Sequence, residues 1–204
     1  MSKKEAIIQA AIKLFAEKSF KGASTAELSA MTHVAEGTIY YHFKTKEDLL
    51  VHVLERIKGE ILQEYKRYWT ERDPPRTGLE QVEEAMSLYL YLAGKFEDRF
   101  LLLHRRYLYE LAEVNATCRQ YLIDIYDCLV DIFEQAVLAG QRDGSIVEAP
   151  PRKTALLLFT MADGLVRFKN YNLYDSSALF PELIAASNRM LARTAGALPS
   201  HPQE

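Results

Sequence analysis

The chain has 204 residues, of which 49% are hydrophobic and 26% are charged, so it is an ordinary globular sequence that is long enough to bury a substantial core. Its formal net charge of −3 excludes a uniformly basic nucleic-acid-binding protein, and any DNA-binding surface must therefore be local. It has neither a run of about 18 uncharged apolar residues nor the apolar segment of a secretory signal, which predicts a cytoplasmic protein without a membrane span.

Helical periodicity predicts an all-α protein, and the first 46 residues are expected to form a small domain of three helices. Apolar residues at helical spacing predict a first helix over residues 3–18. Ser24, with Glu27 three positions later, has the pattern of a capping box, which predicts a second helix from there to about residue 32. A third short helix is expected over residues 36–42.

Residues 47–204 are expected to form a larger helical body. Thr45 can cap a long helix over residues 46–72. The helices predicted after it cover residues 76–93, 97–113, 116–140, 151–171 and 178–195, divided by glycine, proline, aspartate and asparagine. Cys118 and Cys128 fall on one of these helices, about 15 Å apart along its axis, whereas a disulfide spans only about 7 Å. Both thiols are therefore expected to be free.

Residues 24–42 have the pattern of a helix-turn-helix. The second helix would be about 10 Å long, which fits a major groove about 12 Å wide. If Ile39 points inward, a rotation of about 100° per residue places Gly37 and Tyr41 on the opposite, outward side. Hydroxyl groups and a helix N-terminus on that side suit phosphate contacts. Packing in the core is the competing interpretation of these rings, and it is the one we adopt for Ile39 and Phe43.

The segment GTIYYHFKTKEDLL, with Ala10, Ala11, Leu14 and Phe15 before it, resembles the TetR family of bacterial transcription regulators over about residues 5–52. The resemblance implies a one-component regulator, most often a repressor, that binds a palindromic double-stranded DNA operator as a homodimer and is released by a small-molecule ligand. The residues expected to contact DNA are Ser24, Thr25, Ala35, Glu36, Gly37, Thr38, Tyr40, Tyr41, His42 and Lys46.

Two residues depart from the pattern of this family. His33 replaces the usual glycine of the turn, so a left-handed backbone there would be strained. Glu36 stands where lysine or serine is frequent, and an acid near phosphates is unfavourable unless it accepts a hydrogen bond from cytosine N4. The first 50 residues hold seven lysines, six acids and no arginine. Hydroxyl contacts, backbone contacts and DNA shape are therefore expected to carry specificity.

The stretch ALLLFTMADGLVRF, residues 155–168, is apolar nearly all round, which predicts burial on every side. The resemblance implies that this helix and the helix over 178–195 form the dimer interface, and a well-covered monomer core is the alternative.

Rings and cations gather in the larger domain, where a pocket between helices is expected to bind the effector. The candidate ligand-binding residues are Tyr89, His104, Arg105, Tyr107, Tyr126, Phe159 and Phe168. The competing interpretation makes the arginines salt-bridge partners and the rings core residues. The stretch over 35–40 is similar to acyl-CoA-sensing members of the family, which suggests a hydrophobic or fatty acyl effector.

An enzyme is not expected. The sequence has no GxSxG, GxGxxG, P-loop, HExxH or CxxC motif, and its five histidines have no paired metal spacing. No metal or other cofactor is therefore expected. The alternative to a regulator is a helical ligand-binding or scaffold protein whose N-terminal unit does not read DNA.

Overall fold

The computed structural model describes residues 2–18 and 20–192, and over these residues it contains α-helices and no strands. The helices are α1 (Lys3–Glu17), α2 (Thr25–Thr32), α3 (Glu36–His42), α4 (Lys46–Thr70), α5 (Gly78–Lys95), α6 (Glu97–Leu103), α7 (Arg106–Val114), α8 (Ala116–Asp143), α9 (Pro151–Asn170) and α10 (Ser176–Leu191). The prediction of an all-α fold with a helix-turn-helix at the N-terminus is confirmed.

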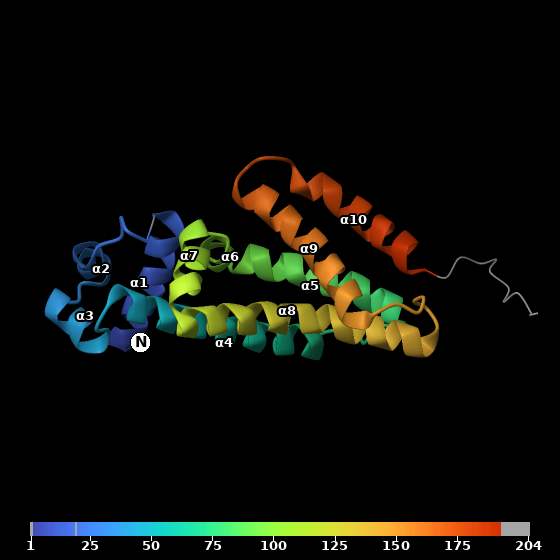
Figure 1. The fold of residues 1–204 in the computed structure, drawn as a ribbon, viewed down its shortest axis with the longest axis horizontal. Helices are drawn as coiled ribbons and strands as arrows, with labels where there is room; N and C mark the ends of the chain where they lie inside the picture. Colours follow the sequence, from blue (N-terminus) through green and yellow to red (C-terminus); the bar gives the residue numbers. More distant parts are fainter. Residues whose placement is uncertain (1, 19, 193–204) are drawn as a thin grey trace, which may run out of the picture.

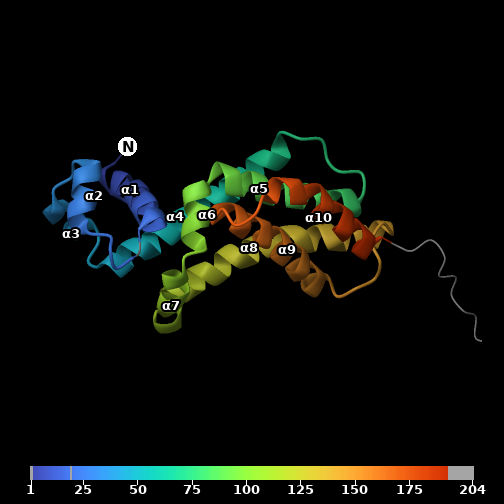
Figure 2. The ribbon, with the colours of Figure 1, turned by 90° about the horizontal axis from the view of Figure 1, so that it is seen from above.

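The molecule is elongated, with α1, α2 and α3 together at one end (Figure 1). Helix α4 leads from this end into the larger body, where it packs along α8. Helix α8 also contacts α5, α7 and α9, so it is the central helix of the body. Seen from above, α7 lies at the edge of the body, and α10 covers α5 and α9 (Figure 2).

The N-terminal domain has a compact apolar core. Phe15 of α1, Leu28 of α2, Ile39 of α3 and Leu49 of α4 are each no more than 3% exposed. Helix α1 contacts α2, α3 and α4 on this side and also contacts α6 of the larger domain. The small domain is therefore fixed to the body through both α4 and α6. The proposed boundary after residue 46 falls at the start of α4, within a continuous core.

A close approach of α5 and α8 fixes the far end of the body. A Cβ atom on Gly78 would lie 1.9 Å from the backbone nitrogen of Gly140, so only glycine fits at this contact. The amide of Gly78 donates a 2.6 Å hydrogen bond to Asp143 at the end of α8. This bond satisfies an amide of the first turn of α5, which has no partner within its own helix.

One predicted element was wrong, and α5 ends later than expected. The single helix expected over 97–113 is broken between Leu103 and Arg106, where the side chain of His104 is held by contacts from α9. Gly94 was expected to end a helix, but α5 continues to Lys95. A glycine inside a helix is unfavourable by only about 1 kcal/mol, which packing overrides. Helix α10 ends at Leu191, and residues 193–195 of the helix expected over 178–195 lie outside the described residues.

Candidate nucleic-acid interface

A reciprocal capping box starts α2. The amide of Glu27 donates to Ser24 Oγ at 3.2 Å, and the amide of Ser24 donates to Glu27 Oε2 at 3.0 Å. Hydrogen bonds from Lys18 and from the backbone of Ser24 keep the pKa of Glu27 below its usual value, so this carboxylate stays charged. The predicted capping box is confirmed, and it fixes where the helix-turn-helix begins.

The turn between α2 and α3 contains the predicted strain. His33 ends α2 with φ 54° and ψ 27°, which is the left-handed region that favours glycine. Val34 then packs into the core with 7% exposure, and α3 starts two residues later. The left-handed residue reverses the chain, and the buried valine anchors the turn to the domain.

Helix α3 has one buried side and one open side, as its phase predicted. Ile39 is 1% exposed, and Phe43, just beyond the helix, is 2% exposed. Tyr40 and Tyr41 are 53% and 76% exposed. A Cβ atom built on Gly37 would have no other heavy atom within 4 Å, so the backbone is open to an approaching surface there.

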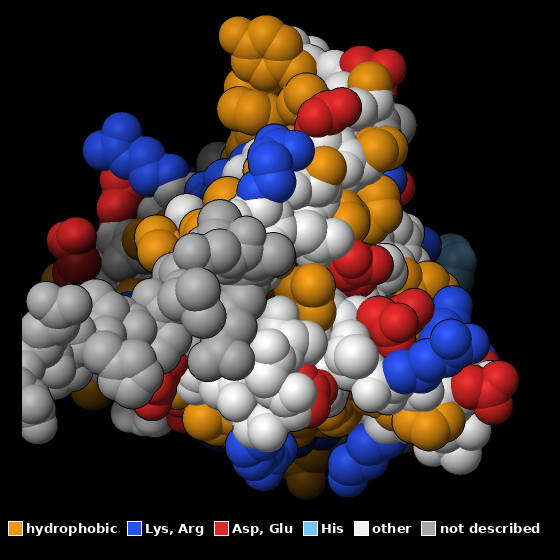
Figure 3. Space-filling view, turned by 90° about the vertical axis from the view of Figure 1, so that its right-hand side faces the viewer, with side chains coloured by type: hydrophobic (Ala, Val, Ile, Leu, Met, Phe, Trp, Pro, Cys, Tyr) orange, Lys and Arg blue, Asp and Glu red, His pale blue; other side chains and the backbone are white. Residues whose placement is uncertain are grey.

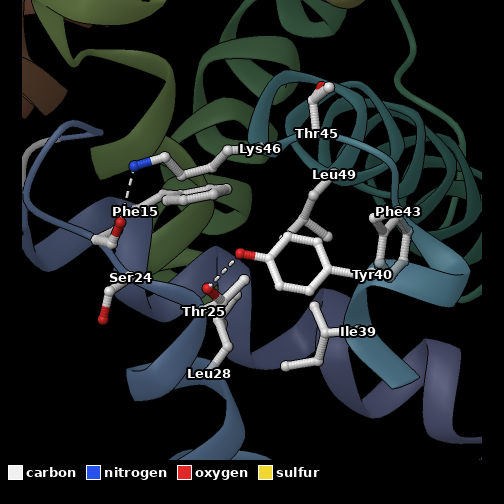
Figure 4. Close-up of a pocket in the computed structure, with 11 residues that line it drawn as sticks. Phe15, Ser24, Thr25, Leu28, Ile39, Tyr40, Phe43, Thr45, Lys46 and Leu49 are labelled. Atoms are coloured by element: carbon white, nitrogen blue, oxygen red, sulfur yellow. Dashed lines mark hydrogen bonds between the residues drawn. The ribbon is translucent and has the colours of Figure 1, made fainter. Parts of the chain in front are cut away.

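A hollow of about 260 Å³ lies between α2, α3 and the start of α4 (Figure 4). Tyr40 Oη lies 3.0 Å from Thr25 Oγ1, so these two hydroxyls link the outer ends of α2 and α3. Ser24 and Thr45 also line the hollow, over an apolar floor that includes Leu28. Hydroxyl groups around a concave surface suit contacts with a phosphate backbone.

Lys46 lies at the edge of this hollow, but its ammonium group is already engaged. Nζ donates to the carbonyl oxygens of Phe20 at 2.6 Å and Ala23 at 2.8 Å. It also lies 4.9 Å from the centre of the Phe20 ring. Because an ammonium has three donors, one N–H remains for a phosphate. The sequence offered no signal for these two carbonyl contacts.

The expected contact residues therefore divide by position. Ala35, Glu36, Gly37, Tyr40 and Tyr41 are exposed, as is Ser24, whereas Thr25, Thr38, His42 and Lys46 are half-buried. All ten belong to α2, α3, their flanking residues or the first residue of α4. His42 packs against the edge of the Tyr41 ring at a centroid distance of 5.3 Å, which orders the outermost tyrosine.

The candidate effector residues do not form one group. Tyr89, Tyr126 and Phe159 meet in the body, where both tyrosines pack edge-on against the Phe159 ring at 5.3 and 5.9 Å. Phe168 packs instead against Tyr174, at 5.1 Å. Arg105 and Tyr107 turn away from the body and contact the carbonyl oxygens of α1.

The body contains a buried polar cluster around Asp163, which sequence reasoning missed. One carboxylate oxygen accepts hydrogen bonds from Tyr89 at 2.6 Å and His104 at 2.9 Å, and the other accepts one from Arg167 at 2.8 Å. Burial raises the pKa of Asp163, but these bonds outweigh it and lower the pKa to about 2. Asn170 donates to the other ring nitrogen of His104, so the histidine presents its N–H to the carboxylate. A lone acid within an apolar helix was the available signal.

An open groove of about 490 Å³ lies between α7 and α8. Tyr109 and Tyr126 line it, and their hydroxyl oxygens lie 2.6 Å apart. Leu122 and Ile123 provide apolar surface, and Arg119 is among the charged residues of the lining. The Tyr109 hydroxyl also donates to the carbonyl of Leu103, the last residue of α6. The groove thus borders the break between α6 and α7.

Large apolar side chains are exposed on α9, on α10 and on the loop between them. They are Leu156, Leu157, Tyr171, Leu173, Tyr174, Leu179 and Met190. Apolar side chains gather at the top of the view in Figure 3, over this corner. Leu157 is 59% exposed, so α9 is not buried on every side within one protomer. Exposed apolar side chains on neighbouring helices are typical of an interaction site.

Residues 2–18 and 20–192 contain no group of three or more His, Cys, Asp or Glu side chains that could hold a metal ion. No helix within those same residues is long and apolar enough to cross a membrane. Cys118 and Cys128 are both free thiols.

Sequence comparison matches residues 7–53 to the bacterial regulatory proteins of the tetR family. Over 188 residues the chain is 25% identical to the fatty acid metabolism regulator protein of Bacillus subtilis, covering 91% of this chain and 90% of that protein. It is also 25% identical to the HTH-type transcriptional repressor DhaR of a Mycobacterium species, covering 80% of each chain.

Solved structures share this fold at low sequence identity. A transcriptional regulator FadR from Bacillus subtilis in complex with stearoyl-CoA superposes with a TM-score of 0.72 at 23% identity, covering 91% of this chain and 98% of that one. A regulator from Saccharomonospora viridis in complex with choline superposes with a TM-score of 0.80 at 18% identity, covering 94% and 98%. At these identities the two likenesses concern the fold.

Proposed function

We propose that this chain, which belongs to the TetR family of bacterial transcription regulators, is a repressor that binds a palindromic operator as a homodimer and leaves it when a small molecule binds. The observation that carries the proposal is the outward side of α3, where Gly37 is open and Tyr41 is 76% exposed beside a hollow lined by hydroxyls. A helical scaffold protein would have no need of exposed rings at this position.

Helix α3 is the proposed reading helix, and it would enter the major groove through Gly37, Thr38 and Tyr41. Ser24 and Thr25 at the start of α2, together with Tyr40, would contact the phosphates on one side. The one unused N–H of Lys46 would add a charged contact at the edge of the hollow. Few cations face this surface, so two half-sites bound by one dimer would supply the affinity that a single domain lacks.

The second protomer is proposed to cover the apolar surface of α9 and α10. Exposed leucines at residues 156 and 157 follow each other on α9, and Leu179 and Met190 lie on α10. Two copies of such a helix pair would bury these side chains in a four-helix contact with twofold symmetry. This dimer would place two reading helices on one side of the DNA.

The effector is proposed to bind in the body and to be hydrophobic or fatty acyl in character. The relative named for fatty acid metabolism and the neighbour bound to stearoyl-CoA support this class. The groove between α7 and α8 offers apolar surface for a long apolar molecule, and its lining includes Arg119 as well as Glu113 and Asp127. A thermal-shift series with stearoyl-CoA should raise the melting temperature, and a series with free coenzyme A and choline should not.

DNA binding is tested first by selection from random sequences, followed by fluorescence anisotropy on the selected DNA across a salt series. The wild-type protein should select a palindrome, with an affinity that falls steeply as salt rises. Tyr41→Ala should weaken binding by about 30-fold, because the dimer loses about 1 kcal/mol at each of two hydroxyl contacts. Tyr41→Phe removes only the hydroxyl, so it separates the contribution of the hydroxyl to DNA affinity from that of the ring. Failure to select any sequence would favour the scaffold alternative.

A further inference from the structure

We infer that Arg105 is a positioning residue for DNA binding: its guanidinium holds the C-terminal end of α1 and so fixes the DNA-binding domain on the body of the protein. This inference rests on the proposed function, because it concerns how the reading helices are placed. It assigns Arg105 a role different from the ligand contact that the sequence suggested.

Arg105 lies at the break between α6 and α7, where neighbouring side chains face opposite ways. His104 is 5% exposed and bonds to Asp163 inside the body. Arg105 extends outward to α1. The carbonyl of His104 also accepts a 3.2 Å hydrogen bond from Tyr171, just after α9. The residues at the break are therefore bonded to the body on one side and to α1 of the DNA-binding domain on the other.

Arg105 binds the C-terminal end of α1 through charge-assisted hydrogen bonds. Arg105 Nε donates to the carbonyl of Ala16 at 2.8 Å, and one terminal nitrogen donates to the same oxygen and, at 3.4 Å, to that of Glu17. Helix α1 has no basic residue in its own last turn. Carbonyl groups at a helix C-terminus lack partners within the helix and attract cations. Arg105 supplies from the body the cation that α1 lacks.

From this point a short series of contacts reaches the helix-turn-helix. Tyr107 donates a 3.3 Å hydrogen bond to the carbonyl of Phe15, and its ring stacks on Phe20 at 5.3 Å. The carbonyl of Phe20 accepts from Lys46, which also binds the carbonyl of Ala23, next to the capping residue of α2. Each step joins buried or half-buried groups. A shift of the break would thus reach the start of α2 through Lys46, the first residue of α4.

The position of each reading helix in a dimer sets the spacing between half-sites that the protein accepts. Loss of the Arg105 contacts should let the two DNA-binding domains sample more orientations. Operator affinity should then fall, and discrimination between half-site spacings should weaken. The number of phosphate contacts should not change, so the salt dependence should stay the same.

The test uses the full-length protein, the selected operator, and two further operators whose half-sites are one base pair closer together or farther apart. Arg105→Ala should weaken binding to the selected operator by about tenfold, because each protomer loses the charge-assisted contacts that restrict the orientation of its DNA-binding domain. Its preference for that operator over the two altered ones should shrink by a similar factor. Arg105→Lys, which keeps a cation near the carbonyls, should recover most of both quantities.

Arg106→Ala is the matched control. The Arg106 side chain is 92% exposed, and among the ion pairs of the described residues it pairs only with Glu110. The Arg106→Ala substitution therefore removes the same charge one position away without changing a contact to α1. Hydrogen exchange of residues 13–18 should accelerate in Arg105→Ala and stay unchanged in Arg106→Ala. If the wild type selects an operator but Arg105→Ala matches Arg106→Ala in affinity and spacing preference, the inference is overturned. If the wild type selects none, the proposed function itself fails.

Discussion

The helix-turn-helix and the body use polar side chains in opposite ways. In the N-terminal domain, Tyr40 and Tyr41 are open to solvent, and the capping contacts of Ser24 and Glu27 join residues three positions apart. In the body, Asp163 is 8% exposed and has partners 59 and 74 positions away. The groups that we propose contact DNA are exposed, whereas the carboxylate of Asp163 already accepts hydrogen bonds from Tyr89, His104 and Arg167.

This difference separates stability from binding. A change on the outer side of α3 removes few contacts within the protein, so its effect should appear in DNA affinity. A neutral side chain at position 163 would leave the hydrogen-bond donors around it without the carboxylate that they bind. The effect should therefore appear first in the free energy of unfolding. Variants in each region can test whether the two properties are as separable as the structure indicates.

The largest effect is expected from Asp163→Asn. The amide turns a donor toward Arg167 or toward His104 and Tyr89, so at least one buried hydrogen bond is lost. The free energy of unfolding should fall by about 3 kcal/mol, as measured by urea denaturation. Asp127→Asn is the control, because Asp127 pairs with Arg152 at the surface and should lose less than about 1 kcal/mol. Equal losses for the two variants would contradict a special role for the buried cluster.

Gly37→Ala should change the stability of the fold and the affinity for DNA in opposite directions at one residue. Alanine favours a helix over glycine by about 0.5–1 kcal/mol, and the site is open, so the protein should become slightly more stable. The added methyl group would meet the DNA, and operator affinity should fall by about tenfold, or 1.4 kcal/mol. Gly59→Ala on α4 is equally open and provides the control. It should gain stability without losing affinity, as measured by thermal unfolding and anisotropy.

Acid should weaken the body through Asp163. Its pKa is lowered to about 2 in the folded protein, below its usual value of 3.8, so its stabilisation is present above pH 4 and is lost as the pH falls toward 2. The difference in unfolding free energy between the wild type and Asp163→Asn should therefore shrink by about 1 kcal/mol between pH 6 and pH 3. Denaturant titrations at several pH values measure this difference, and a constant difference would refute the assignment.

The smallest effect is expected at two residues other than glycine whose backbone is left-handed within the described part of the chain. His33 in the helix-turn-helix and Asn172 in the loop after α9 have φ values of 54° and 50°. His33→Gly should relieve strain and raise the free energy of unfolding by about 0.5 kcal/mol. Asn172→Gly should change it by less, because the short polar side chain of asparagine can form local hydrogen bonds in this conformation. Calorimetric unfolding of both variants measures the contrast, and a larger gain at Asn172 would reverse our interpretation.

Much of the N-terminal domain could be predicted from the sequence because its signals are local. Ser24 and Glu27 marked the start of α2 by their spacing, and the phase of α3 followed from Ile39 with a rotation of about 100° per residue. The strain at His33 followed from a residue type in a turn where glycine is usual. Each inference needed only neighbours within a few positions of the residue concerned.

The sequence by itself thus determined the helical fold, the outward side of α3 and the resemblance to DNA-binding regulators. Only the tertiary structure decided where the helix expected over 97–113 breaks, which partners surround Asp163, and that Arg105 faces α1 and not a pocket. The physical reason is the range of the interactions. Periodicity and capping depend on residues within one or two turns. The contacts of His104 with Asp163 and of Tyr107 with Phe15 join residues 59 and 92 positions apart, and nothing in the local sequence identifies these partners.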